Sequence, residues 1–173
     1  GDGQYLTNVG GASTDAWAQD TWGNLVAGTG AGQSLNGANS ECNILIGPDA
    51  GKSLSSGGSN IIMGRDAGCA STGGDFNVFL NWEAGLNQQG DENIFIGKYA
   101  GKGTGGSSWN GAYNIAMGSK AGCSLDGGDY NIFLGKYAGR SVDSGNTNIA
   151  LGCAAGKDLT SGVSNVLIGH GAG

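Results

Sequence analysis

The chain has 173 residues and a net charge of −6, and 38 of its residues are glycine whereas only one is proline. The excess of negative charge disfavours a nucleic-acid-binding surface, and no run of 18 apolar residues is present to span a membrane. A glycine content this high is typical of disorder unless the sequence repeats strictly, so the repeats decide the fold class.

We expect residues 1–23 to be an irregular lead-in or a degenerate repeat that begins near Asn8. Because the chain starts at Gly1 without a basic and apolar leader, we also expect it to be a segment of a longer protein. A unit of about 17 residues then recurs nine times over residues 24–173. Each unit begins with an asparagine, which we number as position zero: Asn24, Asn43, Asn60, Asn77, Asn93, Asn114, Asn131, Asn148 and Asn165.

Three apolar residues follow each asparagine, and a turn residue ends the run at position four. A run this short, opened by a β-branched residue or leucine, predicts a strand rather than a helix. Alanine and glycine recur at positions seven and eight, and leucine or valine often follows at position eleven, which predicts a second short strand. Two strands and two turns make one coil of an all-β solenoid, or β-roll. Nine coils stacked at about 4.8 Å give a rod of roughly 40 Å.

Two positions predict how the coils stack. Position four is asparagine at Asn81 and glycine in the other copies, and these residues tolerate the left-handed backbone of a tight turn. The asparagines at position zero, stacked in register, are expected to form an amide ladder along the rod. Contact with a ligand is the less favoured role for that row. The glycines at position four include Gly47, Gly64, Gly97, Gly118, Gly135, Gly152 and Gly169.

Both faces of the predicted strand are apolar, because positions one, two and three all hold apolar residues. One face can fill the coil, and the other needs a second surface to cover it. We expect the row at position two, notably Phe79, Phe95 and Phe133, to form an interface between parallel copies of the chain.

Units such as residues 131–139 (Asn-Ile-Phe-Leu-Gly-Lys-Tyr-Ala-Gly) and 148–156 (Asn-Ile-Ala-Leu-Gly-Cys-Ala-Ala-Gly) resemble the repeats of bacteriophage long tail fibres, of the marine and T4-like type. Trimeric autotransporter adhesins carry a related β-roll with a shorter period. The resemblance covers residues 24–173 and implies a parallel homotrimer that forms the shaft of a virion tail fibre, outside the cell. It implies contact with a host glycan or protein through another part of the fibre. A bacterial surface adhesin or extracellular filament is the alternative.

Candidate chemical sites are few. Asp49, Asp66 and Glu83 share position six of consecutive coils, about 5 Å apart. We expect a solvated acidic stripe, eased by Arg65 and Lys98. Cation binding is the alternative, and the paired carboxylates of a carbohydrate-active solenoid are less favoured. No cofactor is expected, and nothing in the sequence indicates an enzyme.

The cysteines and one tryptophan complete the candidates. Cys42, Cys69, Cys123 and Cys153 have no metal-binding spacing and are expected to be buried free thiols, with a disulfide framework as the alternative. Cys69 and Cys123 lie three coils apart, beyond the reach of a disulfide. Trp109 lies in a four-residue insertion, where it either stacks on a sugar or covers the rod.

Overall fold

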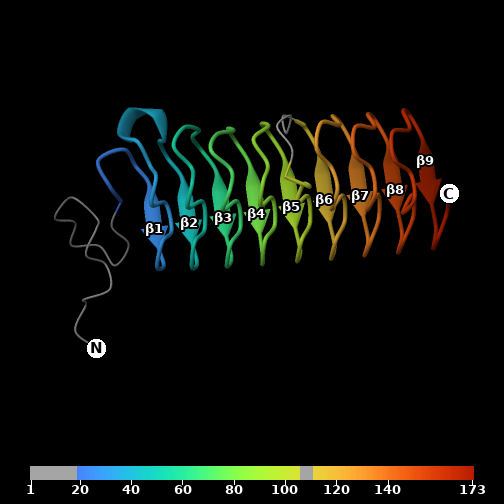
Figure 1. Ribbon diagram of the computed structural model, residues 1–173, viewed down its shortest axis with the longest axis horizontal. Helices are drawn as coiled ribbons and strands as arrows, with labels where there is room; N and C mark the ends of the chain where they lie inside the picture. The colour runs from blue at the N-terminus through green and yellow to red at the C-terminus, as the bar shows by residue number, and fades with distance from the viewer. Residues whose placement is uncertain (1–18, 106–110) are drawn as a thin grey trace.

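The computed structural model describes residues 19–105 and 111–173, which wind as a solenoid along one axis (Figure 1). Asn8 and Trp109 lie outside these residues. Within them, one short 3₁₀ helix, η1 (Gly37–Asn39), is present, and no helix is long and apolar enough to cross a membrane. The nine strands are β1 (Leu25–Ala27), β2 (Ile44–Ile46), β3 (Ile61–Met63), β4 (Val78–Leu80), β5 (Ile94–Ile96), β6 (Ile115–Met117), β7 (Ile132–Leu134), β8 (Ile149–Leu151) and β9 (Val166–Ile168).

The strands form one parallel sheet in chain order, β1 to β9. Each residue pairs with its equivalent in the next repeat, as Ile44 with Ile61 and Ile61 with Val78. The pairing keeps this register across the 21-residue interval, where Phe95 pairs with Ala116. The all-β solenoid predicted from the repeat is therefore confirmed.

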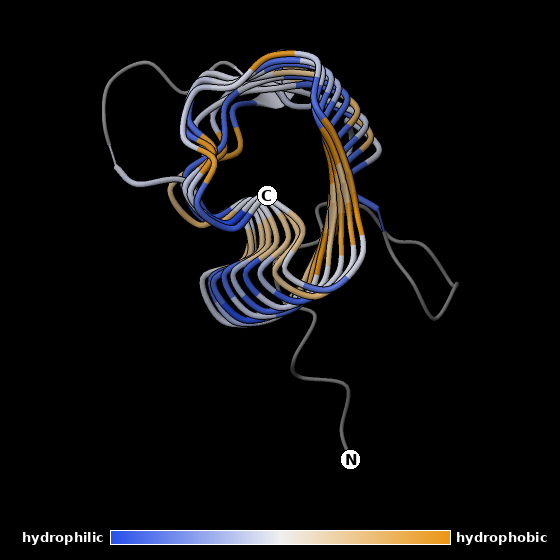
Figure 2. Cartoon of the chain, turned by 90° about the vertical axis from the view of Figure 1, so that its right-hand side faces the viewer, coloured by the Kyte–Doolittle hydropathy of each residue, from blue (hydrophilic) through white to orange (hydrophobic). Residues whose placement is uncertain are grey.

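The interior of the coil is filled from position two of each strand. Phe79 and Phe95 stack with centroids 5.4 Å apart and planes 7° apart, and Ala116 separates Phe95 from Phe133 in the same row. Buried alanines at position seven and buried leucine or valine at position eleven close the core from the opposite side. Seen along the rod, the apolar sheet forms one wall of each coil (Figure 2).

The second strand predicted in each coil is absent from the described residues. Backbone hydrogen bonds do join the coils there, as from Gly51 N to Ala67 O, 2.9 Å. However, positions six and eight have positive φ, 56° at Asp49 and 55° at Gly51, which is incompatible with an extended strand. This wall of the coil is therefore a stacked turn rather than a sheet.

The turn after each strand is closed at position four, as predicted. Asn81 has φ 100° and Gly64 has φ 135°, so both lie in the region that favours glycine. A second constraint comes from stacking: a Cβ built on Gly152 would lie 2.5 Å from the carbonyl oxygen of Gly169. Glycine recurs here because the backbone both turns and approaches the next coil closely.

The predicted asparagine ladder is present. The Oδ1 atom of Asn131 accepts two hydrogen bonds from Asn148, one from the backbone N at 2.9 Å and one from Nδ2 at 3.1 Å. Nδ2 of Asn131 in turn donates to Asn114 Oδ1, 3.0 Å, and to Gly145 O, 2.7 Å. The same backbone bond links every neighbouring pair from Asn24 to Asn165. The ladder fixes the register of the coils along the whole rod.

Asp20 begins this ladder. Its Oδ1 accepts from the backbone N of Asn24 at 2.9 Å, and its Oδ2 accepts from Asn24 Nδ2 at 3.0 Å. The carboxylate thus replaces the amide oxygen of a preceding asparagine. Within the expected irregular lead-in, residues 1–23, Asp20 therefore takes the place of a repeat asparagine in the ladder.

Substitution of Asn131 tests the ladder. Asn131→Leu leaves the backbone N of Asn148 and the Gly145 carbonyl without partners in the core, so we expect a loss of about 2–4 kcal/mol in unfolding free energy. Asn165→Leu should cost less, because Asn165 is less buried and donates to only one described neighbour. Denaturant unfolding of both variants measures the difference, and equal losses would contradict a cooperative ladder.

Candidate functional site: the outward sheet face and its edges

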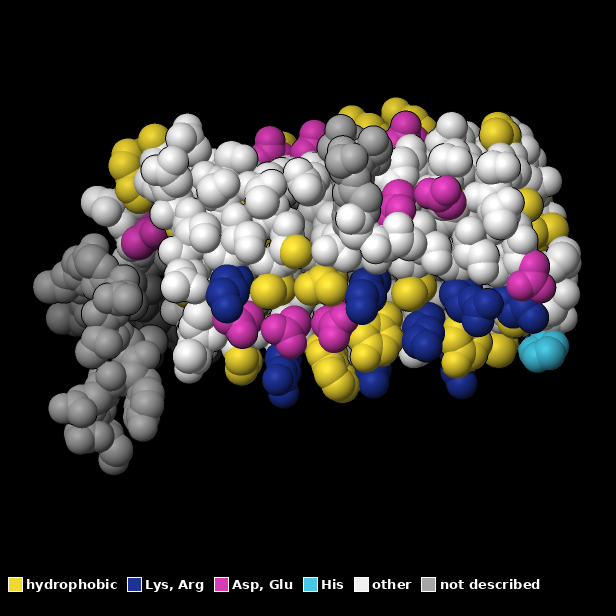
Figure 3. Space-filling view, in the orientation of Figure 1, with side chains coloured by type: hydrophobic (Ala, Val, Ile, Leu, Met, Phe, Trp, Pro, Cys, Tyr) yellow, Lys and Arg dark blue, Asp and Glu magenta, His cyan; other side chains and the backbone are white. Residues whose placement is uncertain are grey.

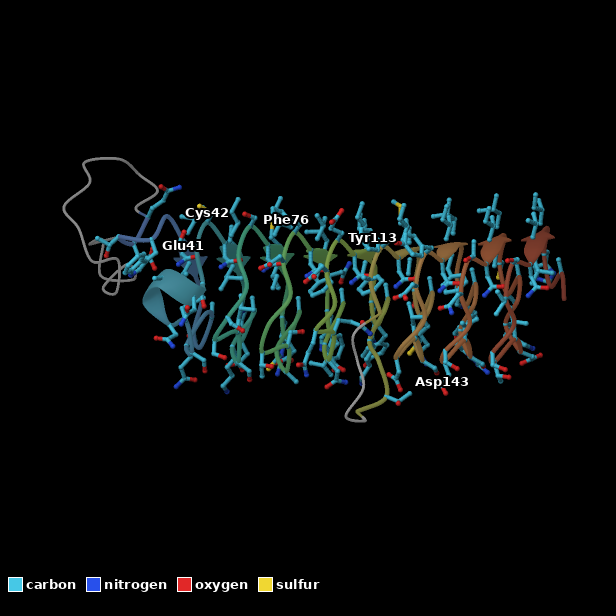
Figure 4. The ribbon with its side chains drawn as sticks, turned by 90° about the horizontal axis from the view of Figure 1, so that it is seen from above. Glu41, Cys42, Phe76, Tyr113 and Asp143 are labelled. Atoms are coloured by element: carbon cyan, nitrogen blue, oxygen red, sulfur yellow. The ribbon has the colours of Figure 1, made fainter. Side chains whose placement is uncertain are left out.

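The outward face of the sheet is apolar along its full length. Positions one and three of all nine strands point away from the coil, and every one holds an aliphatic residue or methionine. Ile61 and Met63 are 37% and 39% exposed, whereas Ile62 between them is 1% exposed. In Figure 4 these side chains project from the strands on the side opposite the stacked turns. The face forms a continuous apolar strip about 40 Å long. On an ordinary protein surface the exposed apolar residues are scattered instead.

The expected interface residues Phe79, Phe95 and Phe133 are not on this face. Each is no more than 1% exposed within the single chain, because position two points into the coil. The prediction that they contact another copy is therefore wrong. A run of three apolar residues does not reveal which side chains point inward. In the closed coil, only the middle side chain of each strand does so. Any interface on this face must instead use positions one and three.

One edge of the face is formed by the residue before each asparagine, and we call it the N-side edge. It includes Phe76, Glu92, Tyr113 and Tyr130. The rings of Tyr113 and Tyr130 stack at 4.8 Å with planes 2° apart. The carboxylate of Glu92 raises the pKa of the Tyr113 hydroxyl. All these residues have φ between 56° and 60°, so the same left-handed backbone recurs along this edge.

The opposite edge is formed by position five, and we call it the C-side edge. It includes Arg65, Trp82, Lys98 and Lys136, all exposed. Lys98 Nζ lies 4.2 Å from the centroid of the Trp82 ring, a cation–π contact. Figure 3 shows acidic and apolar side chains at one border of the view, and basic, acidic and apolar side chains together in the band along the other. The C-side edge therefore carries the cations Arg65, Lys98 and Lys136, whereas the charge of the N-side edge is the carboxylate of Glu92.

The three acidic candidates are paired with cations rather than with one another. Asp49 contacts Lys52 at 3.1 Å, Asp66 contacts Arg65 at 3.3 Å, and Glu83 contacts Lys102 at 2.7 Å. Lys98, expected to ease this stripe, lies over aromatic rings instead. Within residues 19–105 and 111–173, no group of three acidic, histidine or cysteine side chains could hold a metal ion.

A second polar ladder was missed in the sequence. The backbone N of Gly58 donates to Asp75 Oδ1 at 2.7 Å, and the backbone N of Asp75 donates to Asp91 Oδ1 at 2.8 Å. Asp129 and Asn146 make the same bonds further along the rod. These residues all lie two positions before an asparagine. That shared position was the signal in the sequence from which the ladder could have been predicted.

The cysteines are free, but they are not all buried as expected, because Cys42 and Cys153 are exposed and Cys69 and Cys123 are half-buried. Cys69 belongs to the coil of β3 and Cys123 to that of β6, three strands away. Burial raises the pKa of both thiols. The protonated thiol is therefore favoured by folding, and this contribution to stability falls as the pH rises above the unfolded value.

Alkylation of Cys123 checks this effect. We expect its modification by iodoacetamide, followed by mass spectrometry across pH 7–11, to have a midpoint above the ordinary thiol pKa of 9.0, because the fold disfavours the thiolate. The unfolded chain is the control and should return the midpoint to the ordinary value. A folded midpoint below 9.0 would contradict the burial of this side chain.

Comparison of the chain with protein-family models, curated proteins and solved structures finds no significant match.

Proposed function

We propose that the chain is a structural shaft segment of a viral tail fibre involved in host attachment, in which three parallel copies pack the outward faces of their sheets together. The observation behind this proposal is the uncovered apolar face of nine strands. Parallel sheets are normally covered on both faces, and here the coil covers only one. The resemblance of the repeats to long tail fibres favours a fibre shaft and three copies.

The opposite charges of Glu92 and Lys98, on opposite edges of one coil, favour parallel chains related by rotation about the rod axis. Such a rotation keeps every residue at its own level and brings the N-side edge of one chain to the C-side edge of the next. Glu92 then lies level with the neighbouring copy's Lys98, and Tyr130 with the neighbouring copy's Lys136. In the antiparallel arrangement like edges would meet, and the complementarity would be lost.

Aspartate at position three tests whether the outward face is an interface. Leu134 is 37% exposed in the single chain, so Leu134→Asp should leave each coil folded. Three carboxylates near a common axis would, however, oppose assembly. We expect sedimentation velocity to show dissociation, with the exposed turn variant Ser144→Asp unchanged. A Leu134→Asp variant that assembles like the parent would remove the main support for the proposal.

Charge exchange between the edges tests the arrangement of the copies. Glu92→Lys or Lys98→Glu alone places like charges at every junction and should weaken assembly by about 1 kcal/mol per junction at low salt. The double variant restores opposite charges at every junction and should recover assembly.

Mixing the two single variants distinguishes rings of different size. In a dimer of one Glu92→Lys chain and one Lys98→Glu chain, opposite charges meet at every junction. A ring of three always keeps one junction between two identical chains, where like charges meet. We therefore expect partial recovery in the mixture and full recovery in the double variant. No recovery in the double variant would show that these edges do not meet.

A further inference from the structure

The basic residues of this acidic chain are concentrated in the coils of β5 to β8. Six of its eight lysines and arginines lie there, although the net charge is −6. Figure 3 shows dark blue side chains along this part of the rod, among apolar ones. The six residues are Lys98, Lys102, Lys120, Lys136, Arg140 and Lys157.

Two tyrosines lie among these cations. Lys98 and Lys102 place Nζ 4.9 Å and 5.0 Å from the centroid of the Tyr99 ring. Lys136 Nζ and Arg140 Cζ lie 4.9 Å and 5.8 Å from the centroid of Tyr137.

Lys120 lies between the two rings, 5.8 Å from Tyr99 and 5.9 Å from Tyr137. Both rings are partly exposed. The cluster therefore joins aromatic surface and positive charge in one continuous strip.

Most of this charge is not neutralised by the chain. Lys102 pairs with Glu83 and Lys157 with Asp158. Lys98, Lys120 and Lys136, with Arg140, have no carboxylate within 4.0 Å among the described residues. Four cations on neighbouring coils repel one another, and an external polyanion would relieve that repulsion.

The spacing of the strip suits a sugar polymer. Tyr99 and Tyr137 lie two coils apart, about 10 Å along the rod, and cations recur about every 5 Å. A linear acidic polysaccharide offers rings that stack on aromatic side chains and about one negative charge per ring. Double-stranded DNA is a poorer match, because it carries one charge per about 1.7 Å. The row continues past Glu83 into Asp66 and Asp49, which repel any polyanion, so the strip suits a short stretch of polymer lying over the coils of β5 to β8.

We propose that Tyr99, Tyr137 and the surrounding cations bind an acidic polysaccharide that lies parallel to the rod. Tyr99, Lys120, Tyr137 and Arg140 lie at positions six and nine, beside the C-side edge, whose Lys98 and Lys136 the proposed assembly shares with a neighbouring copy. The assignment of the strip to host attachment rests on the proposed function, whereas the binding itself does not. The shaft would then contact the host surface along its side.

Binding of fluorescent polygalacturonate oligomers to the wild-type chain tests this site. We expect saturable binding that weakens with salt and is not competed by neutral dextran. Lys120→Gln with Arg140→Gln should lower affinity at least tenfold, and Tyr137→Ala at least threefold. Lys52→Gln is the matched control: Lys52 shares position nine with Arg140 but pairs with Asp49, so its affinity should equal the parent's.

Three outcomes would overturn the site: no binding by the wild-type chain, equal binding of polyglutamate that Tyr137→Ala does not change, or tighter binding of a single-stranded oligonucleotide. Sedimentation of each variant checks that its assembly is unchanged. Polysaccharide binding by chains that remain monomeric would support this site and contradict the shaft proposal. Assembly of the chains without polysaccharide binding would contradict this site and leave the shaft proposal supported.

Discussion

Parallel stacking in register is the constraint on which the rest of the molecule depends. Because Ile44 lies beside Ile61 and Ile61 beside Val78, every residue meets its own equivalents above and below. A residue that bonds to its equivalent in the next coil then stabilises the whole rod, as the asparagine ladder shows. Like charges in one row repel one another instead. At position six, the run of Asp49, Asp66 and Glu83 is offset by ion pairs with Lys52, Arg65 and Lys102.

The same constraint gives the sheet one face that is covered by its own coil and one that is not. A three-residue strand sends one side chain inward and two outward. Position two, position seven and position eleven close the core within a single chain. The two outward rows have no such partner, so the apolar face follows directly from the length of the strand. The proposed assembly would cover this face with other copies of the chain.

Much of the fold could be predicted because the repeat states the same information nine times. The strands, the turn at Asn81 and the asparagine ladder all follow from residue types at fixed positions. The direction of position two could not be predicted, since Ile, Phe and Leu in a row suit either face. The prediction of a second strand was wrong because Asp49 adopts a left-handed backbone, which its residue type only weakly indicates. The edges required the structure, because it alone places position five and the residue before each asparagine on opposite sides of one face.

The apolar face, rather than any one side chain, links the fold to its proposed use. A coil closed on itself but uncovered outside should be stable in its interior and dependent on neighbours for its solubility. The most direct measurement is the mass of the wild-type chain in solution by sedimentation equilibrium over a wide concentration range. Three copies of the 17.1 kDa chain predict a single species of about 51 kDa. A soluble, monodisperse species of 17.1 kDa at all concentrations would show that the outward face needs no partner.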